Sequence, residues 1–286
     1  YSYGISILNT HLLSNSAVYL SNESFLSKEL WSMISTLKVN SLAGVPEMIL
    51  MLKLMKLEKR LDILENLKYV TQAGGKLDIG HRAYFHELFN KNSIEFYVMY
   101  GQTEATARMS FLGPDCFNEK IASVGQPILG GNFEIQGDQK NVEGLIEGEI
   151  IYQGPNVMLG YASSHLDLGH GDDLGGILHT GDIGYLDEDG YLYITGRKKR
   201  IVKVSGNRIS LDHIETRLSS VAIDNAVTNS GEKILVFITD TSVQGQVKKE
   251  LNSLGIGNSN FKIFQVEKIP LNNNGKVDYL ELSNFF

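Results

Sequence analysis

Cysteine, excess positive charge and long apolar runs are all scarce in this chain, and each shortage excludes a class of protein. The 286 residues include one cysteine, Cys116, so no disulfide can form within the chain, which fits a reducing compartment. The net charge is −7, with no basic excess to displace counterions from a nucleic acid. The longest apolar run, Met48–Met55, is interrupted by Lys53 and falls far short of the ~20 residues that span a bilayer. We therefore expect a cytoplasmic protein without a nucleic-acid partner or a membrane span.

Helix and strand patterns alternate over the first part of the chain. Val45-Pro46-Glu47 begins a helix with proline in its first turn, and Asp78–Phe89 is amphipathic with an aspartate at its start. Leu67–Thr71 and Ile94–Tyr100 have the composition of strands, and we interpret the apolar stretch that opens at Tyr1 as strand-like. This order is typical of a parallel sheet with helices on its faces.

The composition and pattern of the sequence change at about residue 120 and again at Arg197–Arg200. Between these points glycines recur and short strands alternate, which predicts a small, barrel-like β-structure. After the basic run, strand and helix patterns alternate and indicate a compact α+β domain. We predict an α/β protein with a partial α/β subdomain over 1–119, a β-rich subdomain over 120–198, and a mobile C-terminal α+β domain over 199–286.

Three stretches carry residues suited to ligand binding. Tyr100-Gly101-Gln102-Thr103-Glu104 follows an apolar strand, where parallel α/β sheets bind ligands, and offers a ring, a hydroxyl and a carboxylate. Asp182 lies in a glycine-rich turn and could accept hydrogen bonds from a sugar diol, whereas Lys276 lies on an Asn-Gly-Lys loop and could reach a phosphate. Taken singly, the same residues are also explained as a capped helix start, an Asx-turn and a surface lysine.

Taken together, these stretches resemble the motifs of the adenylate-forming superfamily, which includes acyl-CoA synthetases, nonribosomal peptide adenylation domains and firefly-type luciferases. The matching residues are Tyr100–Glu104, Gly148–Gly154 running to Gly160-Tyr161, Thr180–Asp182, Gly190–Arg197, Lys203–Ile209 with His213-Ile214-Glu215, and Asn274–Lys276. The resemblance covers nearly the whole chain. It implies an ATP-dependent, AMP-forming carboxylate ligase that makes an acyl-adenylate and then transfers the acyl group to a thiol.

The resemblance also implies roles for individual residues. Tyr100 would stack on adenine with Gly101 beside it, Thr103 would contact the α-phosphate, and Glu104 would bind Mg²⁺, a cation that prefers oxygen ligands. The ribose hydroxyls would be held by Asp182, with Arg197 nearby. Gly74 and Gly75 would form a backbone wall between the adenine and acyl pockets, and Lys276 would bridge the substrate carboxylate and the phosphate during adenylation.

Further positions concern domain motion and the two substrates. Lys199 falls at the family's hinge, where the small C-terminal domain rotates between the half-reactions and presents the face near Lys203–Gly206 to the thiol. That thiol would belong to CoA or to the phosphopantetheine of an acyl carrier protein. Tyr1-Ser2 resembles the aromatic segment on the acyl side. Amino-acid-activating relatives carry an aspartate where Ser2 stands, so we expect an acid without an α-ammonium group, such as a fatty, aryl or other small acid.

One motif of the family has no counterpart in the chain, namely the Ser/Thr/Gly-rich phosphate loop that precedes the aromatic segment. We therefore expect a truncated or proteolysed chain that is catalytically poor or inactive as it stands. An amino-acid-activating carrier ligase and a non-catalytic nucleotide-binding or interaction fragment remain the alternatives. A luciferase-like oxygenase is compatible with the same scaffold but is not required by any residue.

Overall fold

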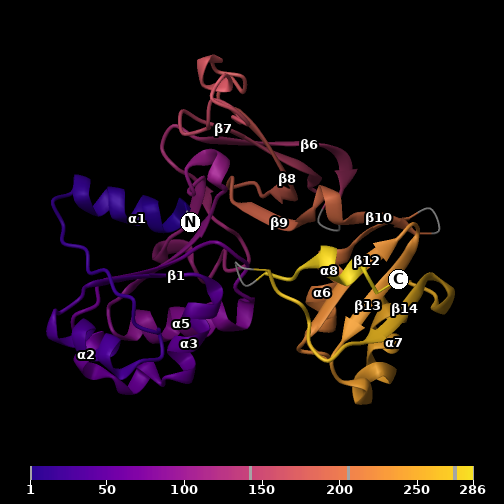
Figure 1. Cartoon of the computed structure of the whole chain (residues 1–286), viewed down its shortest axis with the longest axis horizontal. Helices are drawn as coiled ribbons and strands as arrows, with labels where there is room; N and C mark the ends of the chain where they lie inside the picture. The colour runs from indigo at the N-terminus through magenta and orange to yellow at the C-terminus, as the bar shows by residue number, and fades with distance from the viewer. Residues whose placement is uncertain (1, 142–143, 205–206, 273–275, 286) are drawn as a thin grey trace. The chain divides into compact units, whose positions relative to one another are not determined.

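The computed structural model describes residues 2–141, 144–204, 207–272 and 276–285, which form two compact units (Figure 1). The N-terminal unit comprises residues 1–180 and 185–194, and the C-terminal unit comprises residues 181–184 and 195–286. Each unit has its own apolar core. None of the helices among the described residues combines the length and apolarity needed to cross a membrane.

A five-stranded mixed sheet, sheet A, organises the N-terminal unit. Its strands follow one another in chain order: β1 (Ser41–Gly44), β2 (Tyr69–Gln72), β3 (Glu95–Tyr100), β4 (Ser110–Leu112) and β5 (Gln126–Pro127). The pairs β1–β2 and β2–β3 are parallel, as the alternation of helix and strand predicts, whereas β4 and β5 are added antiparallel. The carboxyl ends of the three parallel strands therefore meet at one edge, where Gly44, Gln72 and Tyr100 end their strands.

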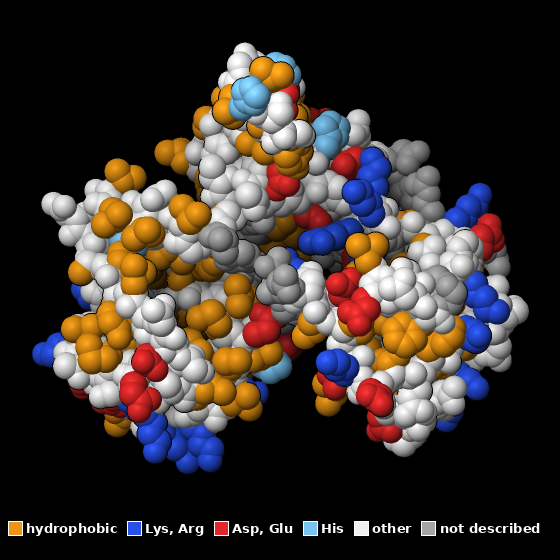
Figure 2. All heavy atoms as spheres, in the orientation of Figure 1, with side chains coloured by type: hydrophobic (Ala, Val, Ile, Leu, Met, Phe, Trp, Pro, Cys, Tyr) orange, Lys and Arg blue, Asp and Glu red, His pale blue; other side chains and the backbone are white. Residues whose placement is uncertain are grey.

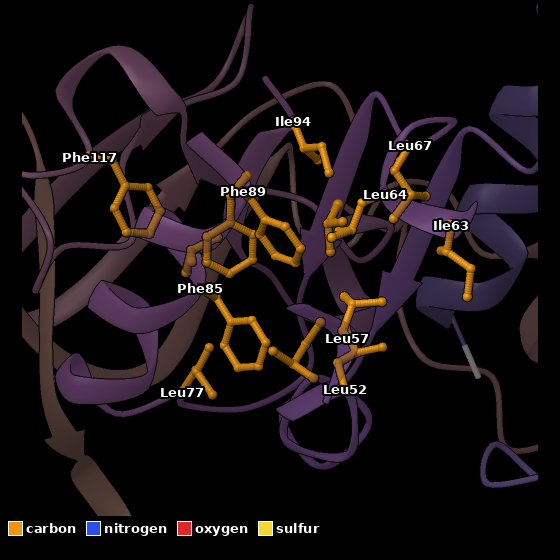
Figure 3. Packing of buried hydrophobic residues seen from close by; sticks show 14 of the residues in the cluster. Leu52, Leu57, Ile63, Leu64, Leu67, Leu77, Phe85, Phe89, Ile94 and Phe117 are labelled. Carbon is orange, nitrogen blue, oxygen red and sulfur yellow. The ribbon is translucent and has the colours of Figure 1, made fainter. Parts of the chain in front are cut away.

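One face of sheet A packs against helices to form the main core. The helices of this part of the chain are α2 (Lys28–Thr36), α3 (Pro46–Leu54), α4 (Leu61–Leu64) and α5 (Ile79–Lys91). Phe85 and Phe89 of α5 lie with Phe96 and Phe117 in a layer of rings whose centroids are 5.3–5.7 Å apart (Figure 3). The Asp78 side chain caps α5 by accepting a hydrogen bond from His81 N at 3.0 Å.

The prediction of a strand-like N-terminal stretch is wrong, because residues Ser2–Leu13 form helix α1. Tyr3 and Ile7, four residues apart, pack together with Ala43 and Met99 of the sheet. The opposite face of α1 is also apolar, with Leu13 88% exposed, so the helical period is obscured in the sequence. Figure 2 shows apolar side chains gathered on the face of the N-terminal unit that carries α1.

The glycine-rich middle of the chain forms an open sheet rather than a barrel. Its order is β6 (Asn132–Lys140), β7 (Ile146–Gln153), β8 (Ile177–Leu186) and β9 (Leu192–Arg197), and no closure between β6 and β9 occurs among the described residues. Gly190, with φ at +77°, lies in the turn between β8 and β9. Closure depends on pairing between distant strands, which alternation within each strand does not specify.

The C-terminal unit is the compact α+β structure that the sequence indicates. A hairpin of β10 (Ile201–Val204) and β11 (Asn207–Ser210) precedes a sheet with the order β12 (Asn225–Ser230), β13 (Lys233–Ile238) and β14 (Phe261–Gln265). The helices are α6 (Leu211–Leu218), α7 (Gln244–Ser253) and α8 (Tyr279–Ser283). Short 3₁₀ turns occupy Leu57–Lys59, Thr103–Ala105, Pro114–Cys116, Asp167–Gly169, Lys198–Arg200, Thr241–Val243 and Asn258–Asn260.

Candidate active site

The turn that follows β3 holds its residues through an unusually close backbone contact. After Gly101, residues Thr103–Ala105 form a 3₁₀ turn, and Thr106 and Ala107 then adopt φ values of +56° and +68°. This path brings the chain back against Gly101, where an added Cβ would lie 2.4 Å from the Ala107 carbonyl oxygen. Glycine is therefore required at position 101 by the fold of the turn.

Two side chains of the same turn anchor it to the middle sheet. The Tyr100 ring lies 6.3 Å from the Phe133 ring of β6, inclined by 37°. Gln102 Nε2 donates a hydrogen bond of 2.8 Å to the carbonyl oxygen of Thr180 in β8. The motif at 100–104 is thus attached to Thr180 within the N-terminal unit.

The hydroxyl and carboxylate at the centre of the motif each have a partner within the N-terminal unit. Thr103 Oγ1 lies 3.1 Å from Ser2 Oγ on the first turn of α1. Glu104 Oε1 accepts a hydrogen bond of 2.7 Å from the hydroxyl of Tyr161, and this contact raises the pKa of Tyr161. The sequence gives Tyr161 no role beyond its motif, so its contact with Glu104 is a finding of the structure.

Gly74 and Gly75 follow β2 at the same edge of sheet A. Gly74 adopts φ at +86°, and a Cβ on Gly75 would lie 3.1 Å from Pro46 Cγ at the start of α3. Gln72 Nε2 donates a hydrogen bond of 2.9 Å to the Gly75 carbonyl oxygen and steadies this segment. A side chain at position 75 would thus press against Pro46, whereas the role of the two glycines as a wall beside a ligand stays a prediction.

The donor set suits Mg²⁺ carried by a nucleotide better than a metal held by protein alone. Among the described residues, no group of three or more His, Cys, Asp or Glu side chains could hold a metal ion. Glu104 provides a single carboxylate. Mg²⁺ usually binds through one or two carboxylates and completes its shell with substrate phosphates and water, so Glu104 fits that mode.

Asp182 and Arg197 lie together in the C-terminal unit, on β8 and β9. Asp182 is 5% exposed, and its Oδ1 accepts a hydrogen bond of 3.2 Å from Arg197 Nε. The Arg197 side chain is 62% exposed, which leaves part of the guanidinium accessible. The structure therefore brings together the two residues that the resemblance assigns to the ribose.

The lysines singled out from the sequence are all exposed. Lys199 lies within the 3₁₀ turn Lys198–Arg200, and Lys203 lies on β10. The backbone of Lys276 closes a loop with Asn272, because Asn272 N donates to the Lys276 carbonyl oxygen at 2.8 Å and Lys276 N donates to Asn272 Oδ1 at 3.1 Å. Tyr1 and Gly206 lie outside the described residues.

A half-buried ionic network in the C-terminal unit was not anticipated from the sequence. Arg200 forms ion pairs with Asp212 and, at 2.8 Å, with Glu215 of α6, and its guanidinium lies 4.0 Å from the centre of the Tyr279 ring. The Tyr279 hydroxyl donates to Glu215 Oε1 at 2.9 Å, and burial raises the pKa of Tyr279. Only the periodicity of α6, which turns Glu215 inward, could have indicated this network.

A cavity of about 490 Å³ between α1 and sheet A was also missed. His11 lines it from α1, with Nδ1 at 2.8 Å from the Ile7 carbonyl oxygen and Nε2 at 3.3 Å from Ser41 Oγ. Arg108 lines it from the turn before β4. The available signal was a lone arginine in the otherwise uncharged stretch 105–112.

Comparisons with known proteins identify the family and the fold of the chain. The family of AMP-binding enzymes matches residues 1–162. A 2-succinylbenzoate–CoA ligase of Bacillus cereus is 37% identical over 130 residues, which are 46% of this chain and 27% of that protein.

Solved structures extend the likeness to the remaining part of the chain. The o-succinylbenzoate CoA synthetase of Bacillus subtilis in complex with the acyl-adenylate intermediate OSB-AMP matches with a TM-score of 0.78 and 21% identity, over 99% of this chain and 58% of that one. An amide bond synthetase of Marinactinospora thermotolerans matches with a TM-score of 0.71 and 22% identity, over 93% of this chain and 56% of that one. The chain thus spans little more than half the length of these structures, which it resembles in fold. Because the family match covers more than half of its residues, the chain belongs to the AMP-binding enzyme family and has the fold of the adenylate-forming enzymes.

Proposed function

We propose that this protein is an ATP-dependent, AMP-forming ligase that joins a carboxylic acid to CoA. In the first half-reaction a carboxylate oxygen attacks the α-phosphorus of ATP, which forms acyl-AMP and releases pyrophosphate. In the second, the thiol of CoA loses its proton and attacks the acyl carbon, which forms a thioester and releases AMP. The names of the relatives, 2-succinylbenzoate–CoA ligases, support CoA over a carrier protein as the acceptor.

The observation that carries this proposal is the pairing of a hydroxyl and a carboxylate on one rigid turn. Thr103 and Glu104 follow a glycine that no other residue could replace, at the carboxyl edge of a parallel sheet. A preorganised hydroxyl and an Mg²⁺-binding carboxylate are what phosphoryl and nucleotidyl transfer need, because catalysis there consists mainly of positioning and charge stabilisation. When bound, Mg²⁺ would neutralise charge on the phosphate oxygens.

The remaining contacts with the nucleotide would also position it or stabilise its charge. Tyr100 would present its ring to adenine, and Asp182, paired with Arg197, would accept hydrogen bonds from the ribose hydroxyls. Lys276 would bring positive charge to the reacting carboxylate and phosphate, since two anions must approach one another there. Its loop is closed by Asn272, so the backbone at its base is held while the long side chain remains free to extend.

The substrate acid is proposed to lack an α-ammonium group. Ser2, next to Thr103, is uncharged, and its hydroxyl is engaged with Thr103 Oγ1. The acid in the cavity beneath α1, Glu95, is exposed and already accepts a hydrogen bond of 2.8 Å from the Tyr97 hydroxyl. Neither residue provides a free anion beside Thr103, which disfavours the alternative of an amino-acid-activating ligase.

Acid-dependent exchange of pyrophosphate into ATP tests the proposal on the intact protein. We expect exchange with at least one member of a panel of aryl, fatty and amino acids, and release of AMP when CoA is added. Glu104→Gln should abolish most of the exchange, whereas Glu134→Gln, an exposed glutamate of β6, should leave it unchanged. Exchange with no acid, or exchange insensitive to Glu104→Gln, would contradict the proposed function.

A further inference from the structure

The carboxylate of Glu104 receives a hydrogen bond from a residue that lies 57 positions later in the chain. The hydroxyl of Tyr161 donates to Glu104 Oε1 at 2.7 Å. No second donor to this carboxylate occurs in the part of the chain that the structure describes, so Oε2 is left for a ligand. One oxygen of the carboxylate is therefore fixed by the protein, and the other is presented by it.

The segment that carries Tyr161 is also bonded through other atoms to the turn that follows β3. Met158 N donates to the Glu104 carbonyl oxygen at 2.8 Å. Asn156 Nδ2 donates to the Ala105 carbonyl oxygen, also at 2.8 Å. The tyrosine thus reaches Glu104 from a base that is already attached to the same turn. Loss of its hydroxyl alone would leave these other contacts in place.

The path of the chain on either side of Tyr161 is restricted by Asp173. Asp173 N donates to the Leu159 carbonyl oxygen at 2.8 Å, and a Cβ at Gly160 would lie 2.9 Å from Asp173 Oδ2. The Tyr161 residue is nevertheless 73% exposed. Because so exposed a ring removes little apolar surface from water, packing does not account for its placement, and the contact of its hydroxyl is the feature to explain.

A fixed carboxylate binds a cation at a lower entropic cost than a mobile one. A glutamate side chain that rotates freely loses conformational freedom when it binds a ligand, and a hydrogen bond made beforehand removes part of that cost. The contact with Glu104 raises the pKa of Tyr161, so the donor stays protonated and neutral, and the carboxylate keeps its own charge. A neutral donor on one oxygen is therefore compatible with a cation on the other.

We propose that Tyr161 is a positioning residue that holds the Glu104 carboxylate in place for the cation carried by the nucleotide. The inference rests on the proposed ligase function, in which Glu104 binds Mg²⁺, and it adds a second residue to that site. Tyr161 acts through Glu104 and need not contact the nucleotide itself. A hydroxyl that instead competed with the cation would have the opposite effect, because its removal would strengthen binding.

Calorimetric binding of ATP to the intact protein, with and without Mg²⁺, tests this inference. The gain from Mg²⁺ is the dissociation constant without the cation divided by the constant with it. We expect Tyr161→Phe to lower this gain by about 3- to 10-fold, which is the effect of one hydrogen bond at a partly exposed site, and to leave binding without Mg²⁺ unchanged. A merely structural role would weaken both measurements alike. In pyrophosphate exchange, KM for Mg²⁺ should rise while kcat at saturating Mg²⁺ stays close to the wild-type value.

A double-mutant cycle determines whether Tyr161 acts through Glu104. Glu104→Gln should remove most of the gain from Mg²⁺, and the addition of Tyr161→Phe to that variant should cause no further loss. Tyr84→Phe is the matched control, because the Tyr84 hydroxyl of α5 also donates to a glutamate, Glu58, at 3.4 Å. It should leave the gain unchanged.

The possible outcomes separate this inference from the function on which it rests. An undiminished or increased gain in Tyr161→Phe overturns the role of Tyr161, as does a further loss in the double variant. Either result leaves Glu104 in its proposed role if Glu104→Gln has lost the gain. A wild-type protein without any gain from Mg²⁺, or a Glu104→Gln variant that keeps it, contradicts both the role of Tyr161 and the assignment of Mg²⁺ to Glu104.

Discussion

Gly101 and Ala107 approach one another so closely that the α-carbon of Gly101 has no room for a side chain. A Cβ at position 101 would lie 2.4 Å from the Ala107 carbonyl oxygen and 2.7 Å from the next backbone nitrogen. The close contact fixes the loop that presents Thr103 and Glu104. The same contact therefore determines both the stability of the turn and the position of the groups proposed to act on the nucleotide.

Gly101→Ala should force this backbone apart. We expect the free energy of unfolding, measured with urea, to fall by about 1–3 kcal/mol, as for other overpacked sites. Pyrophosphate exchange should fall with it. Gly245→Ala is the matched control, because nothing lies within 4 Å of a Cβ there and alanine is the better helix former in α7. A Gly101→Ala variant as stable and active as the wild type would contradict the rigidity of the turn.

Lys276→Ala should separate the two half-reactions. Because Lys276 is proposed to act only while two anions approach, formation of acyl-AMP should fall by orders of magnitude, whereas thioester formation from supplied acyl-AMP and CoA should survive. Single-turnover assays of each step measure the two rates. The exposed Lys268→Ala provides the control for loss of one surface charge. An equal loss in both steps would rule out this division of roles.

Asp187 should make the stability of the N-terminal unit depend on acid pH. Its carboxylate accepts hydrogen bonds from Lys120 Nζ at 2.9 Å and Tyr191 N at 2.8 Å, and these donors lower the pKa of Asp187. A lowered pKa means that the stabilisation is present above the unfolded value of about 3.9 and is lost as the pH falls through the folded value.

The variant Asp187→Asn should therefore lower the free energy of unfolding by about 1–2 kcal/mol at pH 7. That difference from the wild type should stay constant down to about pH 5 and shrink below pH 4. Urea unfolding at several pH values measures it. Glu188→Gln, an exposed change in the same turn, should show neither effect. A difference that grows as the pH falls would show that Asp187 is not stabilised in its charged form.

Tyr279→Phe should destabilise the C-terminal unit without creating a cavity. The hydroxyl donates to both oxygens of the half-buried Glu215, at 2.9 and 3.0 Å, and its loss leaves that carboxylate one donor short. We expect a loss of about 1–3 kcal/mol in urea unfolding. Tyr19→Phe, at a tyrosine that is 40% exposed, should change the stability little. No loss in Tyr279→Phe would indicate that Arg200 and the Val227 backbone N–H satisfy Glu215 without the Tyr279 hydroxyl.

Much of the fold could be predicted where local signals and tertiary packing agree. Helix α6 spans Leu211–Leu218 as the pattern indicates, and α3 begins with proline in its first turn. Strand β12 was missed, because Asn225–Ser230 is largely polar and is a strand only through its pairing with β13. Helix α1 was misread because both of its faces are apolar. The division of the chain into three parts at 119 and 198 stays a prediction.

Some residues of the candidate site could likewise be identified from the sequence, whereas others could not. The turn at 100–104 could be identified from the sequence, since each residue has a chemical use there and the preceding strand is plainly apolar. The contact of Glu104 with Tyr161 could not, because the two residues are far apart in the chain. Arg108 carries only a weak local signal, as the one charged residue of the stretch 105–112. An arginine among small residues becomes informative only when the fold buries its Nε beside a cavity.

The network around Glu215 also links two positions that the proposed mechanism treats as separate. Arg200 is the next residue after the proposed hinge Lys199, and Tyr279 follows Lys276 by three residues. Both side chains are bound to the same carboxylate of α6. Rotation at the expected hinge would therefore be transmitted to the loop of Lys276 through the contacts of Glu215, rather than along the intervening chain. Lys199 and Lys276 would then move together, because the residues near both are attached to helix α6.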